Sequence, residues 1–425
     1  MTEMHALKEV ERFLQDQDIL KAGEALPIVS REQLESGAYN IGCARENGVI
    51  CAFMVRYSGL TILPDALWQL TNLQQLDLPG NQLSTLSESI GQLTRLQKLS
   101  VDHNRLSTLP ETLDKLTQLE ELHVDHNQLT ELSGGIGQFS RLKKLSVYNN
   151  KLTALPSNLS ELAQLEEFSA GHNQLTKLPE TLWQLQQLQV LNIAENQLTT
   201  LPEQIGNLTN LQMLDIAHNR LTRLPESLGR LRNLTSFLYI SDNQLTELPE
   251  ALGNLTKLTY LNVTDNRLTA LPESLGKMVS LKELRLYNNQ LTSLPESLGD
   301  LSQLQELHLK NNRLTALPES LGNLRQLTRL SLCDNRLISL PESLGHLTNL
   351  KAMDIRNNRV MRLPDSLGNL RNLAYLDVRA NRLLSLPASI EKLTKLEKLD
   401  LRWNKLAVRP AWLKRLEEQG CMVFL

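Results

Sequence analysis

Cysteine is scarce in this chain, and its distribution excludes a disulfide framework. Only 4 of the 425 residues are cysteine, and Cys43, Cys51, Cys333 and Cys421 are scattered without paired spacing. Extracellular domains that depend on disulfides carry clustered cysteines, whereas a reducing compartment keeps isolated thiols free. The cysteine pattern therefore predicts a reduced, cytoplasmic protein.

Long apolar runs are absent from the sequence as well. The first 18 residues, MTEMHALKEVERFLQDQD, are charged throughout and lack the apolar segment of a secretory signal peptide. No later stretch approaches the run of about 18 apolar residues that a membrane-spanning helix needs. We expect neither a cleaved signal peptide nor a membrane span, which leaves export without cleavage as the alternative to a cytoplasmic location.

Charge of one sign is not in excess over the whole chain. The net charge is −3 and the pI is near 6.3, which gives no global reason to expect nucleic acid or an anionic membrane as a partner. The charge is nevertheless uneven, because residues 301–425 carry 20 Lys and Arg against 12 Asp and Glu, a net charge of +8. The remaining residues carry −11.

Motifs of catalysis and nucleotide binding are also missing. The chain contains no GxxxxGK[ST] phosphate-binding loop, which argues against a nucleotide switch. We find no nucleophile paired with a base and no paired carboxylates in a cleft. The sequence therefore predicts a protein that is not an enzyme, with no catalytic residues and no cofactor.

What the chain does have is a repeat marked by asparagine. Fifteen asparagines recur every 23 residues, except that the step from Asn219 to Asn243 is 24. They are Asn81, Asn104, Asn127, Asn150, Asn173, Asn196, Asn219, Asn243, Asn266, Asn289, Asn312, Asn335, Asn358, Asn381 and Asn404. A period of about 20 to 29 residues with the pattern LxxLxLxxNxL indicates units that each lay one short strand beside the next.

The unit from Leu258 to Ser280, LTYLNVTDNRLTALPESLGKMVS, shows how one repeat is expected to fold. The alternation around Leu261 predicts a strand with one buried face, and strands of successive units pair in parallel. Asn266 follows the strand, where its amide can hydrogen-bond backbone groups that the bend leaves unpaired. Pro272 and Glu273 favour a short 3₁₀ or irregular turn on the opposite side.

The form LPxxLxxLxxLxxLxLxxNxL, repeated from about residue 50 onward, resembles the leucine-rich-repeat superfamily. It is similar to the type found in plant intracellular Ras-group-related proteins, Scribble-type scaffolds and many bacterial proteins. The resemblance implies an α/β solenoid, a horseshoe with a parallel concave sheet of about 16 strands and short 3₁₀ or irregular convex segments. It also implies a scaffold or recognition arm in signal transduction that binds proteins through its concave face. In relatives that are ubiquitin ligases or GTPases, catalysis belongs to a separate domain.

Three segments are expected along the chain. Residues 1–49 form an N-terminal helical cap, because the apolar residues from Leu7 to Leu14 have the spacing of an amphipathic helix face. Residues 50–408 are the leucine-rich repeats. Residues 409–425 form a C-terminal cap in which a helix and a strand replace the last unit, so both ends are expected to be capped.

Two features interrupt the repeat. Ser87 and Ser133 replace the proline of the turn in two early units, and Gly134 and Gly135 follow the second, so these are the expected local weak points. The extra residue before Asn243 falls in the segment LTSFLYI, where a bulge just before or inside the strand is the expected accommodation. A tolerated insertion without consequence is the alternative.

Aromatic residues make up only 4% of the chain, yet several gather on one predicted face. Those at outward positions are Phe237, Tyr239, Tyr260 and Tyr287 in consecutive units, and Tyr375 and Trp403 farther on. Exposed Tyr and Trp supply contact area at low entropic cost and are favoured interface anchors. The six form a predicted protein-binding hot spot with Tyr260 and Tyr287 as its anchors. Aromatics that only cover neighbouring backbone are the alternative.

A second candidate surface is basic. Arg356, Arg379 and Arg402 occupy corresponding positions of the last three units, each two residues after an aspartate. Arginine binds carboxylates and phosphates through two parallel hydrogen bonds, so this column is predicted to hold an acidic or phosphorylated partner. A self-neutralising lattice with the aspartates is the alternative. The position after each repeat asparagine is also Gln or basic throughout, and it is basic from Arg313 to Lys405.

Histidine and cysteine side chains are candidates for a metal site and a reactive thiol. His123 and His126 form an HxxH pair, and His103 lies one unit earlier at the position of His126. Zinc needs three or four converging ligands, whereas a strand residue and a turn residue diverge, so we predict no metal site. Cys333 is expected to face outward among basic residues. Those charges would lower its pKa and make it reactive, although a passive surface thiol is favoured.

These observations predict a non-catalytic protein-binding module whose concave face, from about Phe237 to Trp403, binds a protein or an extended peptide. The partner is expected to be acidic toward the C-terminal half, and the chain is expected to be a monomer that binds neither nucleic acid nor membrane. The alternative is a bacterial effector or signalling-complex subunit whose activity comes from the N-terminal segment or from a partner enzyme.

Overall fold

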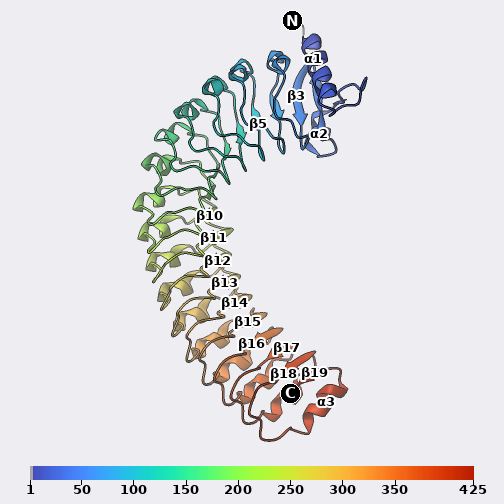
Figure 1. Ribbon diagram of the computed structural model, residues 1–425. Helices are drawn as coiled ribbons and strands as arrows, with labels where there is room; N and C mark the ends of the chain where they lie inside the picture. Colours follow the sequence, from blue (N-terminus) through green and yellow to red (C-terminus); the bar gives the residue numbers. More distant parts are fainter. Residues whose placement is uncertain (1–2) are drawn as a thin grey trace. The chain divides into compact units, whose positions relative to one another are not determined.

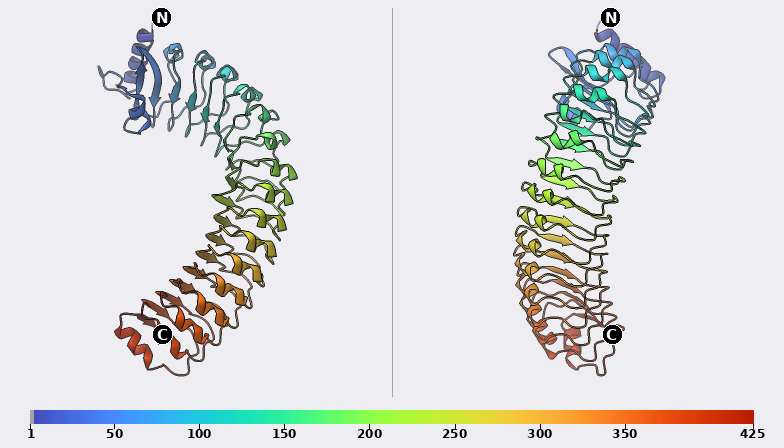
Figure 2. Two further views of the ribbon diagram at one scale, coloured as in Figure 1. Left: turned by 180° about the vertical axis from the view of Figure 1, so that it is seen from behind. Right: turned by 90° about the vertical axis from the view of Figure 1, so that its left-hand side faces the viewer.

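The computed structural model describes residues 3–425 and has two compact units. The N-terminal unit ends at Leu198, and the C-terminal unit runs from Thr199 to Leu425. In each unit the strands lie along one side and short 3₁₀ helices along the opposite side (Figure 1). Views from behind and from the side show the same layering (Figure 2). We call the two sides the strand face and the turn face.

The N-terminal unit begins with elements that differ from the repeat. Helix α1 (Glu3–Asp16) buries its apolar stripe and packs against the first 3₁₀ helix, as the apolar spacing predicts. Strand β1 (Ile28–Val29), helix α2 (Arg31–Glu35) and strand β2 (Ile41–Glu46) follow. Strand β2 pairs in parallel with β1 and antiparallel with β3 (Val49–Val55). The sequence predicted only a helix in this segment. Strands β1 and β2 were not predicted, because their apolar and polar residues alternate only briefly and irregularly.

From β3 onward the strands of the N-terminal unit pair in parallel, one from each repeat. They are β4 (Gln75–Asp77), β5 (Lys98–Ser100), β6 (Glu121–His123), β7 (Lys144–Ser146), β8 (Glu167–Ser169) and β9 (Val190–Asn192). The 3₁₀ helices are η1 (Asp65–Gln69), η2 (Glu88–Gln92), η3 (Glu111–Lys115), η4 (Gly134–Gln138), η5 (Leu159–Glu161) and η6 (Glu180–Gln184).

The C-terminal unit continues the pattern, and its strands pair in parallel in chain order. They are β10 (Met213–Asp215), β11 (Phe237–Tyr239), β12 (Tyr260–Asn262), β13 (Glu283–Arg285), β14 (Glu306–His308), β15 (Arg329–Ser331), β16 (Ala352–Asp354), β17 (Tyr375–Asp377), β18 (Lys398–Asp400) and β19 (Met422–Phe424). The 3₁₀ helices are η7 (Glu203–Asn207), η8 (Glu226–Arg230), η9 (Glu250–Asn254), η10 (Glu273–Lys277), η11 (Glu296–Asp300), η12 (Glu319–Asn323), η13 (Glu342–His346), η14 (Asp365–Asn369) and η15 (Ala388–Lys392), followed by helix α3 (Trp412–Glu418).

The predicted strand count and turn chemistry are confirmed. Strands β3 to β18 are the 16 repeat strands of the described chain, and helix α3 with strand β19 replaces the last unit. In the unit chosen above, Leu261 is fully buried, and Pro272 precedes η10 with φ of −70°, a value that the pyrrolidine ring already fixes. Local chemistry therefore agrees with the repeat pattern at both faces.

The repeat asparagines form a continuous ladder of side-chain to backbone hydrogen bonds. Asn266 is representative: its Nδ2 donates to the carbonyls of Ile240 and Thr264, each at 3.1 Å, and its Oδ1 accepts from the amide of Leu245 at 3.0 Å. All repeat asparagines except Asn404 are buried. Each amide thus satisfies backbone groups of its own unit and of the preceding one, which water cannot reach.

A second ladder runs beside the first, and the sequence analysis missed it. The residue before each repeat asparagine has a positive φ, for example +54° at Asp265 and +56° at Asn288. Short polar residues tolerate this left-handed conformation better than most. Their side chains link successive units, because Asn288 Nδ2 donates to Asp265 Oδ1 at 2.7 Å and Asn311 Nδ2 donates to Asn288 Oδ1 at 2.9 Å.

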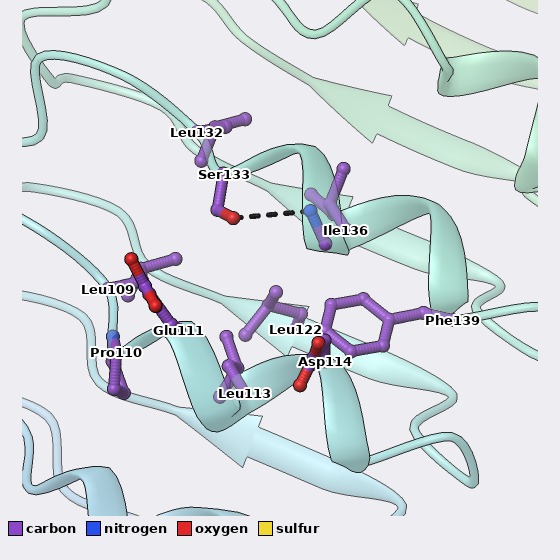
Figure 3. A pocket seen from close by; sticks show the side chains of 11 residues that line it. Leu109, Pro110, Glu111, Leu113, Asp114, Leu122, Leu132, Ser133, Ile136 and Phe139 are labelled. Carbon is purple, nitrogen blue, oxygen red and sulfur yellow. Dashed lines mark hydrogen bonds between the residues drawn. The ribbon is translucent and has the colours of Figure 1, made fainter.

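The turn face has a defect at the predicted weak point. Ser133 stands where other units have proline, and its Oγ accepts a hydrogen bond of 3.2 Å from the amide of Gly135 (Figure 3). Beneath it lies a small apolar cavity of ≈ 10 Å³, lined by residues that include Leu113, Leu122 and Phe139. A cavity of this size is at the limit for one water molecule. The defect is therefore one of packing and is too small for a ligand.

We expect Asn266→Leu to lower the free energy of unfolding by about 1 to 3 kcal/mol, because it leaves the amide of Leu245 and the carbonyl of Ile240 buried without partners. Asn404→Leu is the matched control. Asn404 is only partly buried, so water can replace its bonds and the loss should be smaller. Urea unfolding of both variants measures the difference, and equal losses would contradict a role for burial.

We expect Gly134→Glu to raise the free energy of unfolding by about 0.4 to 1 kcal/mol, because it reduces the freedom of the unfolded chain. No atom lies within 4 Å of the added Cβ, and corresponding glutamates, such as Glu88, accept hydrogen bonds from amides of the next unit. Gly276→Ala should do the opposite, because its Cβ would clash with the carbonyl oxygen of Ser297. Thermal unfolding distinguishes the two, and a loss of stability in the Gly134→Glu variant would refute this explanation.

Candidate functional site

The strand face of the N-terminal unit is occupied largely by ion pairs. Lys98 on β5 pairs with Glu121 on β6 at 3.2 Å, and Lys144 on β7 pairs with Glu167 on β8 at 3.0 Å. These residues occupy the same position in successive strands, where neighbouring side chains are about 5 Å apart. Such a surface is well solvated and already satisfied within the chain.

The strand face of the C-terminal unit begins with a bulge at the extra residue. The amides of Thr235 and Ser236 both donate to the carbonyl of Gln212 at 3.3 Å, as the corresponding amides do in regular units. Leu238, however, is aligned with Leu214, which lies 24 residues earlier instead of 23. The extra residue therefore enters at Phe237, within the segment LTSFLYI that the sequence indicated, and the bulge presents this side chain to solvent with 40% exposure.

Phe237 is part of an aromatic cluster. Its ring centroid lies 5.7 Å from that of Tyr239 and 5.5 Å from that of Tyr260, and the two tyrosine centroids are 5.3 Å apart. Burial raises the pKa of Tyr260 to about 12 and also raises that of Tyr239, so both hydroxyl groups stay protonated at neutral pH. The guanidinium of Arg285 lies 5.4 Å from the Tyr260 centroid and extends the cluster by a cation–π contact.

Three of the predicted aromatic residues lie outside this cluster. Tyr287, predicted at an outward position and as an anchor, follows strand β13 instead of lying in it. Tyr375 is on β17, is 48% exposed and donates from its hydroxyl to Glu397 Oε2 at 2.7 Å. Trp403 is 70% exposed and lies in the turn after β18, with φ of +60°. The structure therefore brings together Phe237, Tyr239 and Tyr260, and leaves the others apart.

A depression opens on the same face between strands β14 and β18. Its volume is ≈ 250 Å³, and its lining includes Arg329, Ala352, Tyr375 and Lys398, which succeed one another along four neighbouring strands. The short side chain of Ala352 leaves a gap between Arg329 and Tyr375. The depression was not predicted, although one small residue in a column of large ones is a signal that the sequence does contain.

The predicted arginine column is a lattice of ion pairs. Arg379 holds Asp377 through two hydrogen bonds, of 2.9 Å from Nε and 2.6 Å from Nη2, and its Nε lies 3.4 Å from Asp400. Arg402 Nη2 donates to Asp400 Oδ2 at 2.7 Å, and the Arg356 guanidinium lies 3.6 Å from Asp354. These arginines are engaged within the chain, which favours the self-neutralising lattice over an open acidic-partner patch.

Burial and hydrogen bonding act in opposite directions within this lattice. Burial raises the pKa of Asp354. At Asp400, burial again favours the neutral acid, but the hydrogen bonds from Arg402 and the charge of Arg379 together outweigh it and lower the pKa. Asp400, whose side chain is fully buried, is therefore the carboxylate that depends most on its arginines.

The histidines of the predicted HxxH pair point to different partners. His123 approaches Glu121 at 3.5 Å, whereas His126 stacks on His103 with centroids 4.0 Å apart. Both His103 and His126 belong to the second, left-handed ladder. His126 is thus held by His103 of the preceding unit, and His123 by Glu121 of its own strand.

One group of possible metal ligands lies elsewhere, on strands β13 and β14. Glu283, Glu306 and His308 offer ligand atoms within 4.8 Å of one another. Both glutamates already have a cationic partner within the chain. Arg285 Nε donates to Glu283 at 2.5 Å, and Arg329 lies 3.6 Å from Glu306. Burial lowers the pKa of His308. The motifs ELR and ELH at equivalent positions of adjacent units are the signal that would have revealed this group.

The prediction for Cys333 was wrong. Its side chain is buried instead of exposed, and burial raises the pKa of the thiol to about 11. Its Sγ lies 3.9 Å from Ser331 Oγ. The thiol is therefore protonated and shielded at neutral pH, which excludes the reactive thiolate considered from sequence.

Within residues 3–425, no helix is long and apolar enough to cross a membrane.

Comparison with known proteins identifies the fold. A family model described as a leucine-rich repeat region matches residues 179–268, 269–353 and 319–419. Other leucine-rich-repeat models match residues 72–93, 94–134, 117–175 and 140–198. No curated protein matches the chain.

Several solved structures are similar to this chain. A leucine-rich-repeat protein from Leptospira interrogans is 35% identical with a TM-score of 0.80, over 93% of this chain and 98% of that one. YopM from Yersinia enterocolitica is 27% identical with a TM-score of 0.69, over 97% and 80% of the two chains. The plant peptide hormone receptor RGFR1, solved in complex with RGF2, is 28% identical with a TM-score of 0.69, over 87% and 64%. The chain, a solenoid of parallel strands and 3₁₀ turns, belongs to the leucine-rich-repeat family.

Proposed function

We propose that the chain is a non-catalytic protein-binding module, a scaffold or recognition arm, that holds an extended peptide or protein segment on the strand face of its C-terminal unit. The leucine-rich-repeat fold is typical of protein–protein interaction and is typically non-catalytic, and one similar structure is that of a receptor in complex with RGF2. The observation that carries the proposal is the exposed aromatic cluster of Phe237, Tyr239 and Tyr260.

The cluster has the properties of an interface anchor. Phe237 is 40% exposed although it belongs to a strand, and it rests against two tyrosines whose rings restrict its motion. A partner side chain that covers these rings removes apolar area from water without ordering flexible groups first. The N-terminal unit also has ring contacts, in which the Tyr148 centroid lies 5.6 Å from that of His126 and 5.9 Å from that of His172. Tyr148 is only partly exposed, whereas Phe237 is exposed.

The depression over Ala352 supplies a second contact for the same partner. It lies on strands β14 to β18, beyond the cluster on β11 and β12, and Tyr375 forms one of its walls. The bond from the Tyr375 hydroxyl to Glu397 holds that wall in place. A segment that crosses the strands can therefore rest on the aromatic cluster and insert one side chain over Ala352.

The arginine lattice has a structural part in this proposal. Arg356, Arg379 and Arg402 balance the three aspartates beside them, so a partner carboxylate would have to displace an existing ion pair. This differs from the role that the sequence favoured for the column, an acidic-partner patch. At the rim of the depression, Arg329 and Lys398 are the cations that an acidic group of the partner would contact, and Arg329 also lies 3.6 Å from Glu306.

We expect a Phe237→Ser and Tyr260→Ser double variant to bind about tenfold or more weakly to peptides selected on the unmodified protein. The double change removes two anchors of the interface. Peptides from a random display library are selected on the wild-type chain and measured by fluorescence anisotropy. Tyr57→Ser is the control, because Tyr57 is 67% exposed but belongs to the N-terminal unit. Selected peptides that bind the double variant as tightly as the wild type would show that the cluster is not the site.

We expect Arg402→Gln to make the protein unfold at a higher pH in an acid titration. The folded pKa of Asp400 lies below the unfolded value, so its carboxylate stabilises the fold above pH of about 4 and this contribution is lost as the pH falls through the folded pKa. Without Arg402, burial raises that pKa and the loss begins earlier. Circular dichroism between about pH 2 and pH 7 measures the shift. Arg336→Gln, which removes an arginine outside the lattice, should leave the titration unchanged.

A further inference from the structure

An apolar stripe runs along one edge of the last units, in the segment between the repeat asparagine and the 3₁₀ turn. Ile338, Met361 and Leu384 are 50%, 47% and 52% exposed. Corresponding positions of the preceding units hold threonine, at Thr269, Thr292 and Thr315. The stripe is therefore a departure from the repeat itself, which does not need an apolar residue at this position.

Backbone hydrogen bonds place the members of the stripe side by side. The amide of Met361 donates to the carbonyl of Ile338 at 3.4 Å, and the amide of Leu384 donates to the carbonyl of Met361 at 3.4 Å. Ala407 continues the row through a bond of 3.1 Å to the carbonyl of Leu384, and Val408 next to it is 72% exposed. Three exposed apolar side chains in register, with a fourth at the end, form a continuous surface.

Basic side chains flank this stripe. Arg336, Arg359, Arg382 and Lys405 each lie two residues before a member of the row, and Arg362 directly follows Met361. All five are exposed. No ion pair within residues 3–425 involves any of these five side chains, in contrast to Arg356, Arg379 and Arg402, which are bound to aspartates. The open positive charge of the C-terminal unit thus lies beside the apolar stripe and not in the lattice.

The spacing of the stripe fits a helix better than an extended chain. Neighbouring strands are about 4.8 Å apart, so the two steps from Ile338 to Leu384 cover about 10 Å. A helix spans about 10.5 Å from residue i to i+7, and its apolar residues at i, i+4 and i+7 fall near the same intervals. An extended segment with the same three contacts at i, i+2 and i+4 spans about 13 Å and falls out of register.

We propose that this edge is a second docking surface, which takes an amphipathic helix of a partner protein with apolar residues along one stripe and acidic residues on both flanks. The apolar residues of the helix cover Ile338, Met361 and Leu384, and its carboxylates pair with Arg336, Arg359 and Arg382. The surface is separate from the strand face, so it stands independently of the proposed peptide-binding site.

A synthetic peptide tests this proposal. The probe is a fluorescent, helix-forming peptide of about 18 residues with Leu at i, i+4 and i+7 and Glu on both flanks, and a scrambled peptide of the same composition serves as its control. The first variant carries Ile338→Thr, Met361→Thr and Leu384→Thr. The second carries Arg336→Gln, Arg359→Gln and Arg382→Gln. Both sets introduce side chains that other units already have at these positions, so the fold should be kept.

Fluorescence anisotropy should show that each variant binds the helical peptide about tenfold or more weakly than the wild type. The second variant should also lose most of the salt dependence of binding. Control changes of Arg105, Arg220 and Arg267 to Gln, in the same column of other units, should have little effect, as should the Phe237→Ser and Tyr260→Ser variant. Failure of the strand-face proposal therefore leaves this result intact, and the reverse also holds.

Three results would overturn the proposal. The first is equal binding of the helical peptide to the wild type and to the threonine variant, or of the scrambled and helical peptides to the wild type. The second is sedimentation of the wild type, but not of the threonine variant, with vesicles of phosphatidylserine and phosphatidylcholine, which would make the edge a lipid-binding surface. The third is dimerisation of the wild type, abolished in the threonine variant, in analytical ultracentrifugation.

Discussion

The need to satisfy buried backbone groups between units constrains everything else in this protein. Each chain turn after a strand buries amides and carbonyls that no regular ladder can pair, and one asparagine side chain serves two units at once. A unit is therefore incomplete alone, and its neighbours supply the missing partners. Within the stacked units, Asn pairs buried backbone groups, Leu fills the core and Gly lies against the next unit. A small number of outward columns is left free to vary.

A binding site is therefore expected where the residue type in one of these outward columns changes from charged or polar to apolar or aromatic. Columns that alternate Lys and Glu, as on the N-terminal strand face, pair within the chain and present a satisfied surface. The aromatic cluster departs from this pattern at the one irregular step of the repeat, where the bulge exposes Phe237. The stripe from Ile338 to Leu384 departs from it by replacing threonine. Neither change is needed for the core, because the buried positions of these units keep apolar residues.

Much of the fold follows from the sequence because its determinants are local and repeated. The period sets the strands, Pro272 and its equivalents set the 3₁₀ turns, and the position of the extra residue sets the bulge. The capping segments were harder, since β1 and β2 occur once and have no period to identify them. The state of Arg356 and Arg336 could not be distinguished from composition. Both follow an aspartate by two residues, but only Arg356 forms an ion pair with it, at 3.6 Å from Asp354.

Cys333 and the left-handed ladder lie just beyond the strands, where the alternation of buried and exposed residues no longer holds. Alternation predicted that Cys333 faces outward and is exposed, but its short side chain, 3.9 Å from Ser331 Oγ, is buried. The next residue, Asp334, has φ of +59° and belongs to the second, left-handed ladder, because it accepts a hydrogen bond from Asn357 Nδ2 at 2.7 Å. A period of two applies only within a strand of three residues. Tyr287, Cys333 and Trp403 all lie just beyond a strand, and there alternation predicts neither exposure nor backbone conformation, because Cys333 is buried and Trp403 has φ of +60°.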